Sequence, residues 1–361
     1  MIVGTRTRPR SRGMRQSNRR AAPRPYSRRA REARPVDGDE PRIRVIEGRG
    51  SWRSRALIAL LRLASRGPLP LDADLAALRR RYETMDARHF PLDPAVRREP
   101  VRCNGVAAEW ISVPESRPGR TLLYLHGGSF AFRFPNTHAA FAARLCRRLG
   151  TRALIPDYRL APEHPFPAAP DDCHATWRWL LANGCDPADS VFAGDSAGGN
   201  LALVTLHRAC RAGEPLPACA VLLSPAVDCT MTSPSMVENE DRDPLFQLRN
   251  LLVFRRHYVA SPSLYTNPDV SPLFADFHGF PPLFLQAGLA EMLRDEALRT
   301  AQKAHAAGVD VELELWPGTV HAFQIASFLP EAGLAVDEIV RFVLARTRWE
   351  SPAGAGAPPR P

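Results

Sequence analysis

The stretch Gly194-Asp195-Ser196-Ala197-Gly198 constrains the fold of this chain more than any other part of the sequence. A short apolar run, Val191 to Ala193, precedes it, and Ala197 to Ala212 follows with the spacing of a helix. A serine on such a sharp strand-to-helix turn needs glycines two residues to either side, because side chains there would clash. The stretch therefore predicts a nucleophile elbow with Ser196 at its tip.

A serine hydroxyl is a weak nucleophile near neutral pH and needs a base. His321 follows the last predicted strand, Val311 to Trp316, so its loop can reach the elbow at the edge of a sheet. Five of the ten histidines fall in segments that favour a structural or surface role: His89, His207, His257, His278 and His305. We therefore predict that His321 is the base.

The base needs a carboxylate that orients its ring. In folds with a nucleophile elbow, the acid lies between the serine and the histidine in the chain. Two acidic residues follow the predicted strand Leu283 to Gln286, namely Glu291 and Asp295. Glu291 lies in the strand-end loop, whereas Asp295 lies one helical turn later and is expected to face solvent. Position favours Glu291, and Asp295 stays open as the alternative.

The reaction of an activated serine with an acyl group creates an oxyanion that needs preorganised donors. His126-Gly127-Gly128-Ser129-Phe130 follows an apolar strand, and its glycines let backbone N–H groups approach a substrate oxygen. We predict an oxyanion hole formed by Gly127, Gly128, Ser129 and, after the nucleophile, Ala197. His126 is interpreted as an organiser of this loop rather than as a proton-transfer group.

Strands and helices alternate through the middle of the chain, which predicts an α/β fold with a mostly parallel sheet and helices on both faces. The predicted strands are Leu122–Leu125, Arg152–Pro156, Val191–Ala193, Ala220–Leu223, Leu283–Gln286 and Val311–Trp316. The predicted helices are Thr137–Leu149, Asp171–Ala182, Ala197–Ala212, Met292–Ala307 and Ala335–Ala345.

Two further segments do not follow this alternation. Residues 51–90 suggest two helices, Trp52 to Ala64 and Ala73 to Tyr82. Residues 229–270 lie between two core strands and contain a helical stretch near Leu245 to Val259. Insertions of this length are usually functional. We expect both segments to cover the active edge of the sheet as a cap, and the N-terminal helices to form a wall of the acyl site.

The net charge of +10 is concentrated at the N-terminus. Residues 1–55 hold 17 of the 48 basic residues and 5 of the 38 acidic residues, so the remainder is almost neutral. The first 50 residues are rich in Arg, Pro, Ser and Gly and are interpreted as a disordered extension. RNA, an acidic membrane or a transporter are alternative partners of this segment, but we expect no nucleic-acid role.

The seven cysteines include no CxxC pair and no Cys/His cluster with metal-ligand spacing, so we expect free thiols, no metal and a cytoplasmic location. No apolar run approaches the ~18–20 residues that span a bilayer. The best candidate, Ala56 to Ala64, is interrupted by Arg62. We therefore expect no stable membrane insertion, although this stretch could touch a lipid surface.

From about Val101 to Val343 the chain resembles the hormone-sensitive-lipase-like family of α/β-hydrolase esterases and lipases. Besides the glycine loop and the elbow, the resemblance rests on four stretches. They are Asp157-Tyr158-Arg159-Leu160-Ala161-Pro162-Glu163-His164-Pro165-Phe166-Pro167-Ala168, Leu223-Ser224-Pro225 through Asp228, Ser271-Pro272-Leu273 and Pro281-Pro282. Two positions depart from the family pattern: Ser129 replaces a third glycine, and Glu291-Met292-Leu293 replaces Asp-Pro-Leu.

The resemblance implies an α/β-hydrolase fold with an eight-stranded, largely parallel sheet and a helical cap. It also implies hydrolysis of short- to medium-chain acyl esters without a metal or an organic cofactor. On this basis the chain is divided into an extension (1–50), an N-terminal cap segment (51–100), a catalytic domain (101–348) and a tail (349–361). The catalytic domain includes a cap insertion at about 229–270.

Three other functions stay open on the sequence. An N-acetyl (amide) hydrolase or a lactone hydrolase would use the same three side chains. A ligand-binding receptor or scaffold of the same fold would need no intact triad, but here serine, acid and histidine all have candidates. A small-molecule ester is the expected substrate, and a homodimer is left open.

Overall fold

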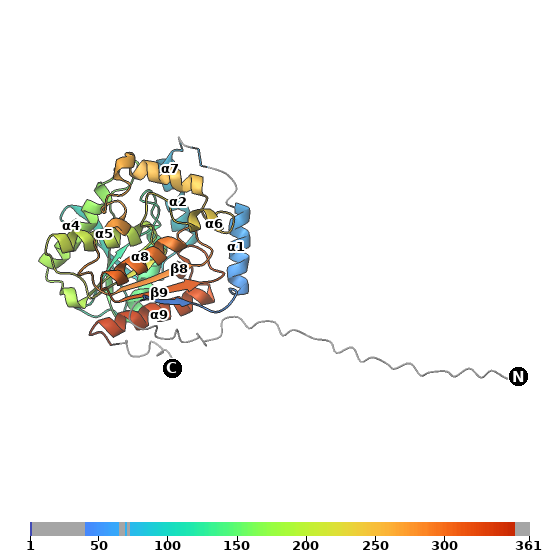
Figure 1. Cartoon of the computed structure of the whole chain (residues 1–361). Helices are drawn as coiled ribbons and strands as arrows, with labels where there is room; N and C mark the ends of the chain where they lie inside the picture. Colours follow the sequence, from blue (N-terminus) through green and yellow to red (C-terminus); the bar gives the residue numbers. More distant parts are fainter. Residues whose placement is uncertain (2–39, 65–68, 71–72, 351–361) are drawn as a thin grey trace.

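The computed structural model describes residues 1, 40–64, 69–70 and 73–350 (Figure 1). A nine-stranded sheet runs through this part of the chain in the order β1-β9-β8-β7-β6-β4-β5-β3-β2. The pairs β2–β3 and β3–β5 are antiparallel, and all other neighbours are parallel. The strands are β1 (Arg42–Val45), β2 (Arg97–Cys103), β3 (Val106–Ser112), β4 (Thr121–Leu125), β5 (Arg152–Pro156), β6 (Ser190–Asp195), β7 (Cys219–Leu223), β8 (Leu283–Gly288) and β9 (Val311–Trp316).

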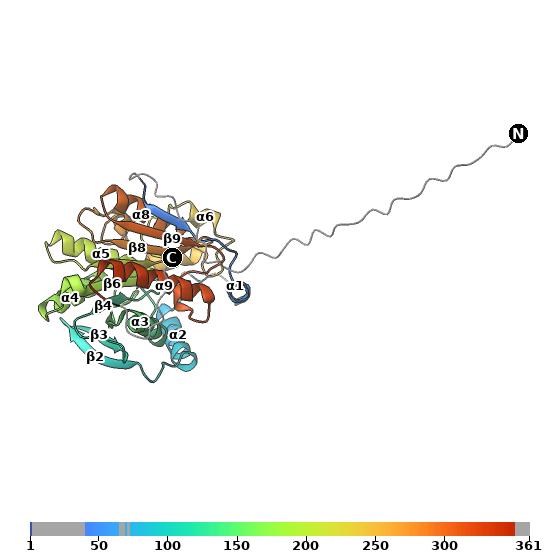
Figure 2. The ribbon, with the colours of Figure 1, turned by 90° about the horizontal axis from the view of Figure 1, so that it is seen from below.

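Helices cover both faces of this sheet, as Figure 2 shows from below. One core cluster joins the sheet to α4, α5 and α8, and a second joins the opposite face to α3 and α9. Burial on both faces explains why the central strands β4 and β7 read as continuous apolar runs. The helices are α1 (Trp52–Ala64), α2 (Leu75–His89), α3 (Pro135–Leu149), α4 (Ala168–Ala182), α5 (Ala197–Arg211), α6 (Ser235–Glu238), α7 (Leu248–Tyr258), α8 (Arg294–Ala306) and α9 (Pro330–Arg346).

The expected α/β-hydrolase architecture is confirmed, but the sheet has nine strands instead of eight. The additional strand β1 lies within the segment that composition assigned to a disordered extension. It pairs with β9, and Arg44 forms ion pairs with Glu314 and Glu338. The composition of the segment could not indicate this strand, because its four residues are ordered only by pairing with β9, which is distant in the sequence. Most of that predicted extension, residues 2–39, lies outside the described residues.

The hairpin of β2 and β3 was also missed. Strand β2 is largely exposed and polar, so it lacks the apolar run that marks a buried strand. The turn residues Asn104 and Gly105 both have positive φ, of 49° and 90°, as an Asn-Gly hairpin turn requires. The boundary expected between residues 100 and 101 falls inside β2.

At the other end of the chain, the predicted tail begins too early. Trp349 is buried, and its indole N–H donates to Asp189 Oδ1 at 3.0 Å. The rest of that segment, residues 351–361, lies outside the described residues. No helix among the residues that the structure describes is long and apolar enough to cross a membrane.

The helices of the two cap segments lie in different places, whereas both segments were expected to cover the active edge of the sheet. Helices α6 and α7, from the insertion, lie over the carboxyl end of the sheet (Figure 1). Helix α2 instead packs behind the loop that follows β4, where Leu75 and Tyr82 contact Phe132. Helix α1 packs beside the loop that follows β9, through Leu57 and Ile58.

The Arg44 ion pair gives a test of how much β1 contributes. Arg44→Ala should lower the free energy of unfolding by about 1–2 kcal/mol, because the buried Glu314 carboxylate loses its cation. Arg42→Ala removes the pairs of an exposed arginine with Asp310 and Glu312 and serves as the control, with a change within about 0.5 kcal/mol. Urea unfolding followed by circular dichroism measures both variants. Equal stability of the two would show that β1 is not held by this pair.

Candidate active site

Ser196 lies at the tip of the turn between β6 and α5, with a φ of 53° and a ψ of −119°. This left-handed conformation is costly for a residue with a side chain, so the surroundings must hold it. The turn can be this tight because Gly198 has no Cβ: one built there would lie 1.9 Å from the carbonyl oxygen of Leu125. The geometry is that of the predicted elbow, and Ser196 lines a pocket at the carboxyl end of the sheet.

His321 and Glu291 meet at the ends of β9 and β8. The ring Nδ1 of His321 lies 2.8 Å from Glu291 Oε2, and both side chains are buried. Glu291 Oε1 accepts hydrogen bonds from the Ser224 hydroxyl, at 2.8 Å, and from the backbone N–H of Gly288. The carboxylate is therefore held on one oxygen and presents the other to the imidazole.

Ser224 was quoted in the sequence only as part of a motif, and its contacts give it a clear place in the site. It is fully buried at the end of β7, with a φ of 46°. Its hydroxyl donates a hydrogen bond to Glu291. It also accepts one, at 3.2 Å, from the N–H of Ala322, which follows His321 in the chain. Ser224 thus ties the acid to the backbone of the histidine loop. A serine directly after a buried strand was the available signal.

The pKa of His321 is raised above its ordinary value. Burial by itself would lower the pKa, but the hydrogen bond and the negative charge of Glu291 outweigh it. Phe246 packs edge-on against the imidazole, with ring centroids 4.6 Å apart, and also lines the pocket with Ser196. The Ser196 hydroxyl and the His321 ring are not hydrogen-bonded to each other in this structure.

Asp295 takes a different position from the one expected. It is buried rather than solvent-facing, and its Oδ2 accepts a hydrogen bond from the N–H of Ser235 at 2.9 Å. Its other oxygen pairs with Arg294. The carboxylate thus holds the start of α6, and Glu291 is the acid that contacts His321.

The glycine loop after β4 turns sharply, with φ of 121°, 55° and 59° at Gly128, Ser129 and Phe130. The N–H of Gly127 donates to Asp195 Oδ1 at 3.0 Å, so this predicted oxyanion donor is already engaged. Within the described chain, the N–H groups of Gly128, Ser129 and Ala197 have no acceptor. Ser129 lines the pocket.

Asp195 and His126 hold this loop from below. The Asp195 carboxylate accepts from the Tyr124 hydroxyl at 2.6 Å and from Gly127. Burial raises its pKa, but the neighbouring His138 and these hydrogen bonds give a net lowering, so it stays ionised. His126 stacks on Tyr158 at 4.2 Å, and burial lowers its pKa to about 4. His126 is thus stacked and neutral, and its role as an organiser of the loop stays a prediction.

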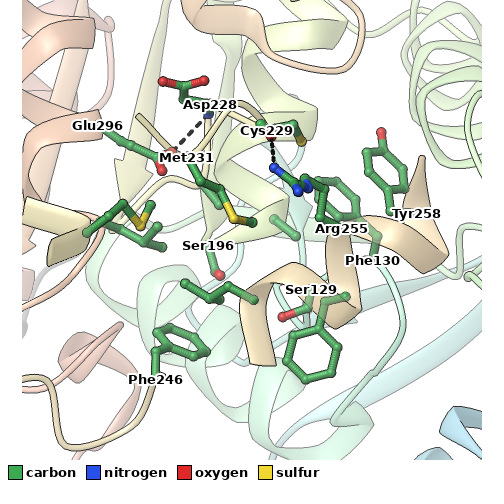
Figure 3. Close-up of a pocket in the computed structure, with 16 residues that line it drawn as sticks. Ser129, Phe130, Ser196, Asp228, Cys229, Met231, Phe246, Arg255, Tyr258 and Glu296 are labelled. Carbon is green, nitrogen blue, oxygen red and sulfur yellow. Dashed lines mark hydrogen bonds between the residues drawn. The ribbon is translucent and has the colours of Figure 1, made fainter. Parts of the chain in front are cut away.

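The pocket in front of Ser196 encloses about 530 Å³, including its open mouth (Figure 3). Its walls are mostly apolar, and the cap insertion supplies a large part of them. None of the described residues of α1 or α2 is among the lining, so the expectation that residues 52–82 wall the acyl site is wrong for them. The lining comprises Ser129, Phe130, Ser196, Ala197, Ala226, Asp228, Cys229, Met231, Met236, Phe246, Leu251, Phe254, Arg255, Tyr258, Leu293 and Glu296.

Besides Asp228, one acidic and one basic side chain line this pocket. Glu296 is buried and accepts hydrogen bonds from the N–H groups of Val227 and Asp228. Burial, with the nearby charge of Asp228, raises the pKa of Glu296 to about 8. Arg255 donates to the carbonyl of Cys229 at 3.0 Å and stands over the ring of Tyr265. Both therefore support the loop around Cys229.

The seven cysteines are free thiols. Among the residues that the structure describes, no group of three His, Cys, Asp or Glu side chains is arranged to hold a metal ion.

The comparisons with known proteins agree with this geometry. A family model described as "alpha/beta hydrolase fold" matches residues 122–325, which is more than half of the chain. The chain belongs to this family. An esterase of Acinetobacter venetianus is 35% identical over 292 residues, covering 81% of this chain and 96% of the relative. An acetyl-hydrolase of Streptomyces hygroscopicus is 39% identical over 241 residues, covering 66% of this chain and 80% of the relative.

Solved structures give the same result. An esterase from the bacterial hormone-sensitive lipase family has a TM-score of 0.77 and 39% identity, and the match covers 82% of this chain and 98% of that one. A second one, a hormone-sensitive lipase from a metagenome library, has a TM-score of 0.77 and 33% identity, and the match covers 82% of this chain and 99% of that one. The resemblance to hormone-sensitive-lipase-like esterases is therefore confirmed.

The contact between Glu291 and His321 can be tested without any substrate. Glu291→Gln should lower the pKa of the His321 imidazolium, because burial remains while the stabilising charge is lost. Asp295→Asn should leave that pKa unchanged, since Asp295 lies among other partners. Titration of the imidazole resonances by NMR measures the pKa in both variants. A larger effect of the Asp295 variant would reverse the assignment.

Proposed function

We propose that this chain is a serine carboxylesterase in which Ser196 is the nucleophile, His321 the base and Glu291 the orienting acid. The observation that carries the proposal is the buried Glu291–His321 hydrogen bond beside a pocket lined by a serine in the elbow conformation. A carboxylate on Nδ1 holds the imidazole so that Nε2 is the nitrogen left to take a proton. The esterases among the relatives support the same reaction class.

The proposed reaction has two acyl-transfer steps. His321 Nε2 takes the hydroxyl proton of Ser196 while the serine oxygen attacks the ester carbonyl. The N–H groups of Gly128, Ser129 and Ala197, which lack other acceptors among the described residues, stabilise the oxyanion. The C–O bond to the alcohol breaks as His321 returns the proton to the leaving oxygen. Water, activated by the same imidazole, then hydrolyses the acyl-enzyme.

The transfer of the Ser196 proton to His321 needs a hydrogen bond between the two side chains, which is not formed in the structure without substrate. Catalytic hydrogen bonds often form only once substrate is bound. Rotation of the Ser196 side chain about its Cα–Cβ bond is the small movement that we propose on ester binding. No rearrangement of the acid is needed, because two donors already hold Glu291 in place.

The pocket supports short- to medium-chain acyl groups. Apolar side chains such as Met231, Phe246 and Leu251 would exclude water from a hydrocarbon chain. Hydrolysis of p-nitrophenyl esters from acetate to palmitate tests this, and we expect a maximum of kcat/KM below the longest chains.

Ser196→Ala should lower kcat by at least about 10⁴-fold. A fluorophosphonate probe should label the wild type and not this variant. Soluble, folded protein without turnover or labelling would favour a receptor of the same fold.

The proposal also fixes the direction of the pH dependence. His321 must be neutral to take the serine proton, and its pKa is raised, so kcat/KM should rise with pH through a value above 6.5. Glu291→Gln should move this rise to lower pH and lower kcat by about 10⁴-fold, since the neutral amide orients and stabilises the imidazolium poorly. Asp295→Asn should keep the wild-type profile. A rise that does not move in the Glu291 variant would contradict the assignment.

An amide hydrolase is the second candidate, because an acetyl-hydrolase is among the relatives and an acetyl group can be bound to nitrogen as well as to oxygen. It would use the same three side chains, with an amine instead of an alcohol leaving. Comparing kcat/KM for an acetate ester and an N-acetylated amine of the same size separates the two. The homodimer and the cytoplasmic location stay predictions, for which sedimentation and cell fractionation are the measurements.

A further inference from the structure

Helix α1 has apolar residues on two opposite sides. Its inner side, with Leu57, Ile58 and Leu61, packs against the cluster that contains Val320 and Phe323. At 100° per residue, a second set of side chains points directly away from that cluster. This outer stripe consists of Trp52, Ala56, Ala59, Leu60 and Leu63, all exposed.

The exposure of the outer stripe is large. Trp52, Leu60 and Leu63 are 68%, 62% and 62% exposed, and the nearby Phe328 is 53% exposed. Figures 1 and 2 both place α1 at the margin of the molecule. Single exposed apolar residues are ordinary, but a continuous stripe along one helix face indicates a surface that binds something.

Three arginines flank the outer stripe, and the sequence of α1 contains no acidic residue. Arg55 and Arg62 lie along one side of the stripe and Arg53 along the other. Arg53 donates to the carbonyl of Phe328 at 2.9 Å, and Arg62 donates to the carbonyl of Arg242 at 3.1 Å. Within the described chain none of the three forms an ion pair. Their charges are therefore available to an anionic partner.

The charge pattern decides between two occupants. A second copy of this chain, docked stripe to stripe, would bring the arginines of both helices together and repel. A membrane with anionic headgroups would accept the apolar side chains and pair with the arginines at the same time. Residues 1–41, which precede the helix in the sequence, add 12 arginines against 4 acidic residues.

We propose that the outer stripe of α1 docks on an anionic lipid surface, with the helix lying in the plane of the headgroups. Docking leaves the inner side of α1 on the histidine loop, so the folded body need not change. The contact of Arg62 with Arg242 places this surface next to the segment between α6 and α7, from which Phe246 lines the pocket. The proposal does not depend on the reaction that the pocket catalyses.

The test is cosedimentation of the full chain with vesicles of phosphatidylcholine that contain about 30% phosphatidylserine. Leu60→Glu/Leu63→Glu should weaken binding at least about tenfold, because two apolar anchors become charges of the headgroup's own sign. Met85→Glu/Phe90→Glu, which places the same charges on exposed apolar residues of α2 and its C-cap, should stay within about twofold. The N-terminal arginines are intact in both variants, so their contribution cancels.

A second readout locates the contact. Trp52 emission should shift to shorter wavelength on anionic vesicles, as the difference between the wild type and Trp52→Phe. Circular dichroism and hydrolysis of a soluble ester check that the Leu60/Leu63 variant is folded. Unchanged vesicle binding by that variant, or equal binding of the wild type to pure phosphatidylcholine, would overturn the proposal. So would a wild-type dimer that the same variant converts to a monomer.

Discussion

The buried hydrogen bond between Glu291 and His321 joins two loops that leave neighbouring parallel strands, and the candidate site is built around it. Because β8 and β9 run in the same direction, their carboxyl ends lie at one edge of the sheet, where residues 30 positions apart can meet. The end of β7 adds Ser224, which binds both the acid and the histidine loop. Three adjacent strand ends thus fix one side-chain pair.

The other half of the site depends on buried polar groups beneath the elbow. Asp195 precedes the nucleophile, and its carboxylate holds Gly127 and Tyr124, so the glycine loop is anchored to the strand that ends in Ser196. Arg79 of α2 donates to the carbonyls of Ala131 and Ala161 and secures that loop from outside. These contacts explain how two backbone stretches with positive φ are held in place.

The cap connects this chemistry to the surface. The segment with α6 and α7 covers Ser196 and sets the size of the pocket, whereas α1 and α2 support the loops on either side. Helix α1 therefore has one packed and one exposed side. Its inner side packs near Val320 beside the base, and its outer stripe faces away from the body. The helix that steadies the histidine loop is also the one that we propose to meet a lipid surface.

Elements and residues whose signals are local could be predicted from the amino-acid sequence. Strands such as Arg152–Pro156 and the helix Trp52–Ala64 were predicted with their observed bounds, because buried runs and helical spacing are visible in a few residues. Ser196 was visible through its glycines, and Glu291 and His321 through their places after strands.

Features that depend on distant partners became visible only in the folded chain. Strand β1 forms by pairing with β9, and Asp295 is buried where it accepts a hydrogen bond from Ser235. The N–H of Gly127 is hydrogen-bonded to Asp195. The pocket walls came from the insertion and not from the N-terminal helices, since packing, and not periodicity, chooses which helix faces a site. Each of these follows from contacts between residues far apart in the chain, which no local pattern encodes.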